Sequence, residues 1–169
     1  MTVRQMAVVV LLLLPTVALG QNLWGGTRAG MTLNQVRGLY PKMYELEQDA
    51  HRPPTFRLDG VDISGHQYKA LFQFKDAQLE RVTLGLTDKV DNGEGLVIGR
   101  ELMNTLDVKY GTAIEKRGWD NDQPYARICE AVWRAGRTDI ELSLLLQPGF
   151  NALVSVTYSA ALAKEADKL

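Results

Sequence analysis

The chain has 169 residues, of which 46% are hydrophobic and 23% charged, with 19 basic and 20 acidic side chains. This composition is typical of a globular domain with a sizeable core, and the near-neutral charge gives no electrostatic reason to expect binding to nucleic acid or to an anionic membrane surface. Because Cys129 is the single cysteine, an intramolecular disulfide is excluded and packing must hold the fold together.

The first 20 residues have the pattern of a secretory signal peptide. Arg4 supplies a positive start, residues 7–14 form an apolar run, and Ala18-Leu19-Gly20 places small residues where a signal peptidase inspects them. We therefore predict cleavage at the end of this segment. The alternative is an uncleaved membrane anchor, but the apolar run is shorter than the roughly 20 residues that a span needs, and Pro15 interrupts it.

A mature chain that begins at Gln21 is expected in the bacterial periplasm or secreted. No cysteine lies near the cleavage site, so a lipid anchor has no thiol on which to form, and we expect no stable membrane insertion of the mature chain. Loss of one of the 19 basic residues leaves 18 against 20 acidic residues, a formal charge of −2. The remaining length fits one ordinary domain.

A short helix is predicted to begin after Thr32. Thr32 and Gln35 form a capping box, in which each side chain accepts a hydrogen bond from the backbone N–H of the other residue. Leu33 and Val36 then recur at helical spacing, and Pro41 prevents the helix from continuing.

The rest of the first half is predicted to be a connection followed by three strands. Residues 42–54 are charged and end in Pro53-Pro54, which indicates a connection, with a helical turn around Glu45–Gln48 as one option. Alternating apolar and polar residues then indicate strands with one buried face. We expect these strands at Phe56–Ile63, with a kink at Asp59-Gly60, at Tyr68–Phe74 and at Leu79–Leu86, with a turn at Lys75–Gln78.

A second helix is predicted before Tyr110. Asp91 and Glu94 are suited to cap its start, and Gly111 is suited to end it. Gly93, Gly95 and Gly99 leave the position of its first turn open. The apolar stripe of this helix consists of Ile98, Leu102 and Leu106.

Strands return after a long polar connection at residues 112–125. We expect them at Ala126–Trp133, Asp139–Leu146 and Ala152–Tyr158, with a hairpin turn at Arg134–Arg137. Cys129 falls in the first of these strands and is predicted to be a buried, inert thiol.

The two halves have the same predicted plan, a helix followed by a polar connection and about three antiparallel strands. We therefore predict an α+β fold built as a tandem αβββ repeat, an antiparallel sheet with both helices packed on one face. The predicted organisation is a signal peptide at 1–20, a single domain at 21–159 with halves at 21–87 and 88–159, and a charged tail at 160–169.

Two segments carry a family resemblance. Gly30-Met31-Thr32, Gln35-Val36 and Pro41 mark a helix start, its middle and its end, and Leu71–Val82 forms a hairpin. These segments resemble the SmpA/OmlA (BamE-like) outer-membrane assembly proteins, and the tandem arrangement is similar to the β-lactamase-inhibitor-protein fold. The resemblance implies the predicted fold and a role in envelope assembly or inhibition. The chain departs from that family because it lacks the lipid-bearing cysteine and is predicted to be a tandem repeat.

The inventory of catalytic side chains is thin. His51 and His66 are the only histidines, neither in a metal-binding spacing, and Cys129 has no second thiol beside it. A loop around Gly93 carries several polar oxygens, but without the spacing of a calcium loop, so a solvated entry to the second helix is favoured. Those residues are Asp88, Asp91, Asn92 and Glu94. We predict no cofactor, no metal site and no enzymatic activity.

Candidate binding residues lie in one loop and on one side of the sheet. Trp119 stands among charged residues, so it is either an anchor for a partner or a lid that folds back over the core. Other candidates alternate away from the predicted core, namely Lys69, Gln73, Arg81 and Glu141, with Thr83 and Ser143 beside them.

These observations favour a non-enzymatic module that binds an envelope protein partner of unknown identity, in envelope assembly or as an inhibitor. No nucleic-acid partner is expected. Two alternatives stay open, a carrier that holds a small ligand in the cleft between the halves and a hydrolase whose carboxylates converge in the fold.

Overall fold

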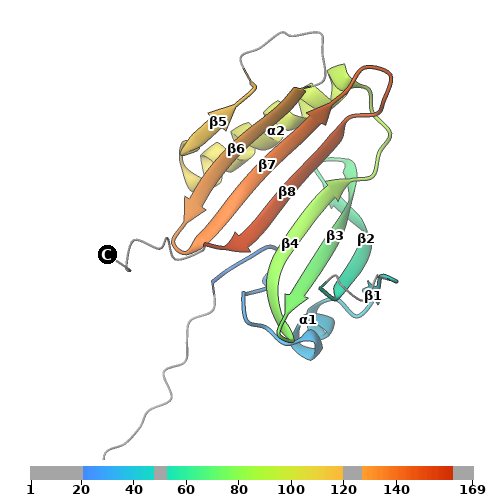
Figure 1. Cartoon of the computed structure of the whole chain (residues 1–169), viewed down its shortest axis with the longest axis vertical. Helices are drawn as coiled ribbons and strands as arrows, with labels where there is room; N and C mark the ends of the chain where they lie inside the picture. The colour runs from blue at the N-terminus through green and yellow to red at the C-terminus, as the bar shows by residue number, and fades with distance from the viewer. Residues whose placement is uncertain (1–20, 48–52, 120–126, 162–169) are drawn as a thin grey trace, which may run out of the picture.

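The computed structural model describes residues 21–47, 53–119 and 127–161, which form two helices and eight strands. Figure 1 shows one twisted sheet with a long helix lying across part of it. The predicted signal peptide and His51 lie outside the described residues, as does the charged tail beyond residue 161.

All eight strands belong to one sheet. The helices are α1 (Leu33–Leu39) and α2 (Asn92–Tyr110). The strands are β1 (Tyr44–Glu45), β2 (Thr55–Ile63), β3 (His66–Lys75), β4 (Gln78–Leu86), β5 (Glu115–Arg117), β6 (Arg127–Ala135), β7 (Thr138–Leu146) and β8 (Leu153–Ala160). Their order is β1-β2-β3-β4-β8-β7-β6-β5, and every neighbouring pair is antiparallel. The predicted mixed class, helices with an antiparallel sheet, is confirmed.

Helix α1 begins and ends as predicted. The side-chain oxygen of Gln35 accepts the N–H of Thr32 at 2.8 Å, and the Thr32 hydroxyl accepts the N–H of Gln35 in return. The helix ends at Leu39, two residues before Pro41, and Val36 is fully buried. A helix of 7 residues is not stable by itself, so its buried side and its caps together must hold it.

The residues before α1 pack over the end of that helix. Trp24 stacks on Tyr40 with ring centroids 5.7 Å apart, and Tyr40 contacts Phe72 of β3 at a centroid distance of 5.3 Å. The Tyr40 hydroxyl also donates a hydrogen bond to the carbonyl oxygen of Gly25. Three rings therefore join the N-terminal segment, α1 and the sheet.

Helix α2 is capped at both ends. The Asp91 carboxylate accepts the N–H of Glu94 at 2.9 Å, as an N-cap should, and Gly111 ends the helix with a φ of 86°. Both predicted caps are confirmed. A positive φ at the end of a helix is readily adopted by glycine and rarely by other residues.

Two glycines inside α2 bring the helix close to the sheet. A Cβ atom on Gly95 would lie 2.3 Å from the Cβ of Ala152, and one on Gly99 would lie 2.3 Å from Cδ2 of Leu144. Both glycines are buried. The three glycines that left the helix start open in the sequence all lie within α2. Gly95 and Gly99 lie where the helix packs against β7 and the residue before β8.

Tight turns join the strands of both predicted hairpins. Asp76 and Ala77 connect β3 and β4 with φ values of 50° and 61°, the positive pair that matches the twist of a two-residue hairpin. Gly136, with a φ of 61°, begins the turn between β6 and β7. The predicted kink in β2 is also confirmed, since the register with β3 shifts around Gly60.

A bulge in β4 was not predicted and changes what this strand buries. Phe74 pairs with Leu79, whereas the residue before Phe74 pairs with Arg81, so Glu80 is an extra residue in the strand. Leu79 and Val82 consequently both face the core, although they stand three residues apart in a strand.

Two segments that were predicted to be connections each contain a short strand. Tyr44–Glu45 form β1, so the described part of the predicted helical turn around Glu45–Gln48, residues 45–47, is not helical. The long connection at residues 112–125 contains β5. Strands of 2 and 3 residues show no periodicity in a sequence. They form because each continues the hydrogen bonding of a longer neighbour, β2 or β6, at an edge of the sheet.

The register divides the sheet side chains between two faces. One row runs across β3, β4, β8, β7 and β6 with no member more than 6% exposed, and it consists of Phe72, Val82, Tyr158, Ile140 and Trp133. The next row points to the other side and consists of Leu71, Thr83, Thr157, Glu141 and Val132. We call the face of this second row the open face.

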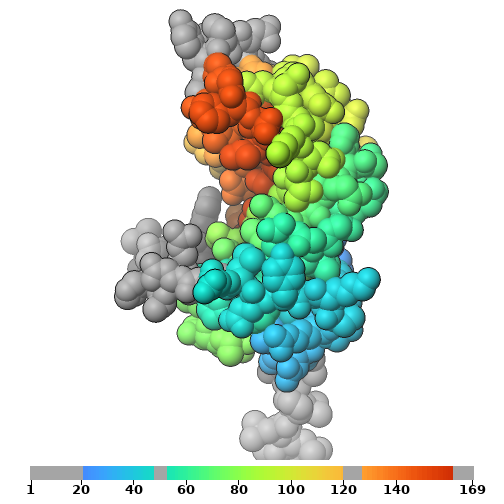
Figure 2. Space-filling view, turned by 90° about the vertical axis from the view of Figure 1, so that its right-hand side faces the viewer, coloured from blue at the N-terminus to red at the C-terminus, as the bar shows by residue number. Residues whose placement is uncertain are grey.

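The helix contacts are made on the buried side of the sheet. Helix α2 contacts β6, β7 and β8, and it lies behind β6 and β7 in Figure 1. The indole N–H of Trp133 donates a hydrogen bond of 2.8 Å to Asp107 of α2. In Figure 2 the first four strands lie below and α2 with the last four strands above, along the long axis of the molecule.

Within the described residues, neither helix combines the length and the apolar character that a membrane crossing requires.

Candidate functional site

The middle of the open face is lined by small and hydroxyl-bearing side chains. Thr83 of β4 and Thr157 of β8 are register partners, and their hydroxyl oxygens lie 3.2 Å apart. Further small residues on neighbouring rows of this face are Gly85, Ser143, Ser155 and Ser159. Short side chains leave the backbone of the central strands accessible, so another molecule can approach the sheet closely there.

Four of the five predicted site residues lie on the open face. Gln73 and Arg81 are register partners, and the Lys69 side chain lies against Gly85, in contact distance of where a Cβ would stand. Glu141 of β7 pairs with Thr157, and β4 and β8 lie between β7 and the strand of Gln73. The structure therefore places the four on one surface without joining them into a single cluster.

Trp119 has a different position from the other four. Its side chain is 9% exposed, and its Nε1 donates a hydrogen bond of 2.8 Å to the carbonyl oxygen of Glu130 in β6. An anchor for a partner would have to present its ring to solvent. The other alternative that the sequence left open, a lid that packs on the core, agrees with this position. An indole is most stable when its ring is buried and its N–H is hydrogen bonded.

An exposed apolar cluster on the open face was missed in the sequence. Ile128, Leu145 and Leu153 are register partners across β6, β7 and β8, on the face away from α2. Ile128 is 56% exposed and Leu153 62%, and Phe150 in the loop between β7 and β8 is 66% exposed. We call these four residues the apolar cluster.

Three members of the apolar cluster, Leu145, Phe150 and Leu153, line a depression of about 270 Å³ together with Gln147 and Asn151. The sequence does contain a signal for the apolar cluster, namely runs of consecutive apolar residues. Leu144-Leu145-Leu146 and Leu153-Val154 break the alternation of a strand with one buried face, so one residue of each run must point to solvent.

A larger cavity lies on the other side of the sheet, at the C-terminal end of α2. Its volume is about 530 Å³. The lining comes from the N-terminal segment, the end of α2, the β6–β7 hairpin and β8, and comprises Gln21, Asn22, Leu23, Lys109, Tyr110, Ala135, Arg137, Thr138, Ile140 and Tyr158. The Thr138 hydroxyl donates a hydrogen bond of 2.9 Å to the carbonyl oxygen of Asn22, which holds the N-terminal segment against the hairpin.

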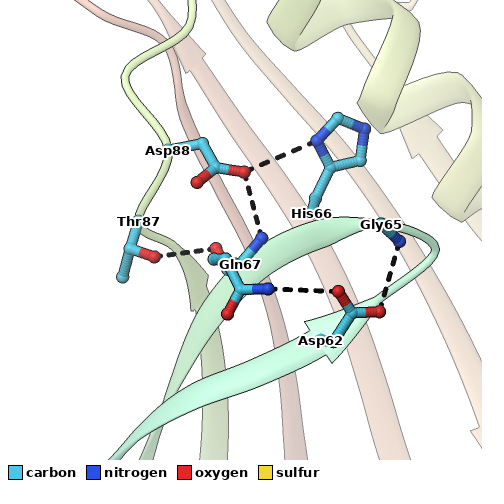
Figure 3. Close-up of polar contacts among 6 residues, drawn as sticks. All are labelled: Asp62, Gly65, His66, Gln67, Thr87 and Asp88. Carbon is cyan, nitrogen blue, oxygen red and sulfur yellow. Dashed lines mark hydrogen bonds and ion pairs between the residues drawn. The ribbon is translucent and has the colours of Figure 1, made fainter.

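Figure 3 shows a polar cluster where the start of β3 meets the segment after β4. One carboxylate oxygen of Asp88 accepts the backbone N–H of Gln67 at 3.0 Å and lies 3.6 Å from Nδ1 of His66. The N–H and the hydroxyl of Thr87 both donate to the carbonyl oxygen of Gln67 at 2.8 Å. These bonds tie the segment that leads into α2 to the sheet, which is a structural role.

The acidic residues near Gly93 serve α2. Asp91 is the N-cap of that helix and Asp88 belongs to the polar cluster of Figure 3. Across the described ranges, no three His, Cys, Asp or Glu side chains are grouped so that they would hold a metal ion.

Cys129 is buried, as predicted. Its thiol donates a hydrogen bond of 3.2 Å to the carbonyl oxygen of Gly118, and its exposed fraction is 0%. Burial raises the pKa of the Cys129 thiol above its ordinary value, with smaller opposing effects from Arg127 and Arg100. A thiol held protonated and away from solvent is a poor nucleophile.

Comparisons of the chain with protein-family models, with curated proteins and with solved structures find no match.

Proposed function

We propose that the protein is a non-enzymatic binding module whose open face takes a protein partner. The observation that carries the proposal is the apolar cluster, in which Ile128, Leu153 and Phe150 are each more than half exposed beside a hydroxyl-lined sheet surface. Scattered apolar residues are ordinary on a protein surface, but register partners on three neighbouring strands form a contiguous patch.

The chemistry of the open face fits a protein surface better than a small molecule. Interfaces between proteins draw most of their energy from a few desolvated apolar or arginine side chains, while polar groups at the rim set the register. The apolar cluster supplies such a centre, and Arg81, Glu141 and Lys69 supply charges of both signs elsewhere on the same face. The occupant is a segment of a folded protein that inserts an apolar side chain between Leu153 and Phe150.

A tandem αβββ arrangement supports the proposal. The sheet order places β4 and β8 at its centre and the short strands β1 and β5 at its two edges, so the order has the same form from either edge. We infer that the sheet consists of two equivalent halves, each with one helix on the same side. Helices on one side leave the other side free for a partner.

The predicted export signal and the resemblance to SmpA/OmlA proteins and to the β-lactamase-inhibitor-protein fold favour an envelope partner, in envelope assembly or inhibition. This step rests on the sequence pattern and on fold analogy, because one fold can host many functions. A second candidate function, the carriage of a small ligand, is favoured by the cavity of about 530 Å³.

Crosslinking capture from envelope extract tests the proposal with a matched pair of variants. Leu153→Ser and Val108→Ser each remove one exposed apolar side chain, the first from the apolar cluster and the second from α2, where Val108 is 91% exposed. We expect wild type and Val108→Ser to capture the same partner, and Leu153→Ser to bind that partner at least about tenfold more weakly.

The affinity of the captured partner decides the outcome. Equal binding to wild type, Leu153→Ser and Phe150→Ala would show that the open face is not the binding surface. Because Leu153 and Phe150 are mostly exposed, the denaturation midpoint of both variants should stay close to wild type, which separates lost binding from lost folding.

A further inference from the structure

The loop between β7 and β8 presents an exposed phenyl ring on a fixed turn. The N–H of Phe150 donates a hydrogen bond of 3.1 Å to the carbonyl oxygen of Gln147, which closes a four-residue turn. Pro148 and Gly149 occupy the two middle positions, and the φ of Gly149 is 79°, as a type II turn requires. Figure 1 shows this loop at one end of the sheet. Phe150 is therefore exposed on a backbone that local chemistry holds in place.

The loop is also anchored after the turn. The N–H of Ala152 donates a hydrogen bond of 3.0 Å to the carbonyl oxygen of Val90, in the segment that leads into α2. The Ala152 side chain is buried beside Gly95 of that helix. An exposed ring on an anchored loop loses less conformational freedom when it binds than a ring on a loose loop. Phe150 is therefore suited to contact another molecule.

The depression in the apolar cluster is suited to receive a ring of this kind. Its volume of about 270 Å³ exceeds the roughly 150 Å³ of an apolar cavity that binds benzene. Leu145 and Leu153 form its apolar wall, and Phe150 lines the same depression. One surface therefore carries both a projecting ring and a place for a ring.

A two-fold axis satisfies both features at once. In a symmetric dimer the same surface of each chain contacts the other, so that each contact occurs twice. The ring of Phe150 in each copy can then lie in the depression of the other, against Leu145 and Leu153. The chain itself thus supplies an apolar side chain of the kind that the depression takes.

The polar side chains of the depression are compatible with two copies meeting. Gln147 and Asn151 line it, and both are amides with donor and acceptor groups. Two copies of one amide can form hydrogen bonds with each other, whereas two copies of one charged side chain would repel. These two positions therefore favour a second copy of the same surface.

The exposed area indicates a weak, reversible dimer. Burial of an aromatic side chain removes about 150–250 Å² from solvent, and Phe150 is 66% exposed. With Ile128 and Leu153, each copy offers an apolar centre on the order of 300 Å². Two such centres bury about 600 Å², and with a polar rim the total lies in the range of transient interfaces, below about 1,200 Å².

We propose that a second copy of this chain covers the apolar cluster, in a two-fold dimer in which each Phe150 enters the depression of the other copy. The inference rests on the proposed function in that both use the same surface, and it adds a regulation. A partner protein has to displace the second copy before it binds. Self-association therefore shields the apolar cluster while no partner is present.

Sedimentation equilibrium of the purified chain over a range of concentrations measures the self-association. We expect the mass to rise from one chain to two at high micromolar concentration and to fall again rapidly on dilution. Phe150→Ala and Leu153→Ser should each weaken dimerisation at least about tenfold, whereas Val108→Ser, which removes an exposed side chain from α2, should dimerise like wild type. A wild type that stays monomeric up to millimolar concentration, or equal dimerisation of both cluster variants, would overturn the proposal.

Asn151→Cys tests the two-fold geometry, because a residue close to the axis lies beside its own counterpart. Mild oxidation should link two copies of this variant through a disulfide. Two copies of Val108→Cys, at a position of α2 that is 91% exposed, should stay unlinked, and the native Cys129 is buried. Dimerisation of the wild type without a link in Asn151→Cys would place the contact elsewhere and refute the proposed dimer.

The two proposals fail separately. Self-association is measured on the chain alone, so a monomeric wild type overturns the dimer and leaves partner capture as the test of the proposed function. If the dimer forms and no partner is captured, the apolar cluster serves self-association and the proposed function fails. If the dimer forms and a partner is captured, that partner should dissociate the dimer, and a dimer that it leaves intact would overturn the regulation.

Discussion

At the scale of single residues, Asp107 joins α2 to the sheet through hydrogen bonds. Its carboxylate accepts hydrogen bonds from the Trp133 indole at 2.8 Å, from the Lys116 ammonium at 3.2 Å and from the backbone N–H of Ala113 at 3.0 Å. Burial alone would raise the pKa of this carboxyl, but the three donors outweigh burial and lower it. The ionised form is therefore the one that the fold stabilises.

We expect Asp107→Ala to lower the free energy of unfolding at pH 7 by about 2–3 kcal/mol, because a charged acceptor is lost and the Trp133 N–H is left without its partner. Since the folded-state pKa is lowered, the contribution of Asp107 is present above its unfolded pKa of about 3.9 and is lost as the pH falls through the lower folded-state value.

Urea denaturation of wild type and Asp107→Ala at pH 7 and at pH 2 measures this difference. The gap between the two proteins should narrow strongly at pH 2. A gap of the same size at both pH values would show that the charge on Asp107 is not what stabilises the contact.

Two buried tyrosines predict a loss of stability in alkali. Burial, with smaller effects from Asp88 and Glu101, raises the pKa of Tyr68 to about 12, and the pKa of Tyr158 is raised as well. An unfolded chain releases these protons near pH 10, whereas the folded chain retains them, so stability present below pH 10 is lost as the pH rises through the folded-state values.

We expect the free energy of unfolding to fall between pH 10 and pH 12, with about 2–3 kcal/mol of the loss due to Tyr68. Tyr68→Phe should remove that share of the slope. Urea melts at half-unit pH intervals test this. An identical slope in wild type and Tyr68→Phe would mean that Tyr68 ionises without penalty in the folded protein.

At the scale of elements, the spacing between α2 and the sheet depends on glycines. Gly99→Ala places a methyl group 2.3 Å from Cδ2 of Leu144, closer than carbon atoms approach. Such overpacking typically costs about 1–3 kcal/mol, which exceeds the gain of up to about 1 kcal/mol from replacing glycine by alanine in a helix. We expect a net loss of stability, measured as a lower urea midpoint.

Gly38→Ala is the matched control for this variant. Gly38 lies in α1, and a Cβ there would have no neighbour within 4 Å. Its replacement should therefore raise the urea midpoint slightly, through helix propensity alone. If Gly99→Ala also raised the midpoint, Leu144 would have room to move and the close approach of α2 would not need a glycine.

Elements governed by neighbouring residues were predictable, and elements governed by distant ones were not. The capping box of Thr32 with Gln35, the Asp91 cap and the turn at residues 75–78 depend on residues close in sequence. The short strands β1 and β5 depend on their longer neighbours, so their own residues carried no signal. The Glu80 bulge was missed for a similar reason, since only pairing with β3 reveals it.

At the scale of the whole molecule, the strand periodicity of the sequence was enough to predict an antiparallel sheet. It was not enough to predict every candidate site. Alternation correctly separated Lys69, Gln73, Arg81 and Glu141 from the buried row. It could not place Trp119, because that residue lies in no periodic element and its burial depends on Glu130.

The cavity was beyond prediction for a different reason. It requires Leu23 to lie beside residues 109–110, 135–140 and 158, and no local pattern states which distant segments meet. From the sequence, a small ligand held in a cleft between the halves was only one of the alternative functions. The hydrogen bond from Thr138 to Asn22, which joins residues 116 positions apart, shows how the N-terminal segment closes one side of it.

The central pairing of β4 with β8 makes the sheet vulnerable to exchange between molecules. Residues 81–85 of β4 pair with residues 155–159 of β8, and within the sheet this pairing alone joins the first four strands to the last four. If it opens, each strand presents a long edge with unpaired backbone groups, in contrast to the short strands at the ordinary edges. Two opened chains can then pair reciprocally, β4 of one with β8 of the other, and form a closed dimer with every native hydrogen bond remade.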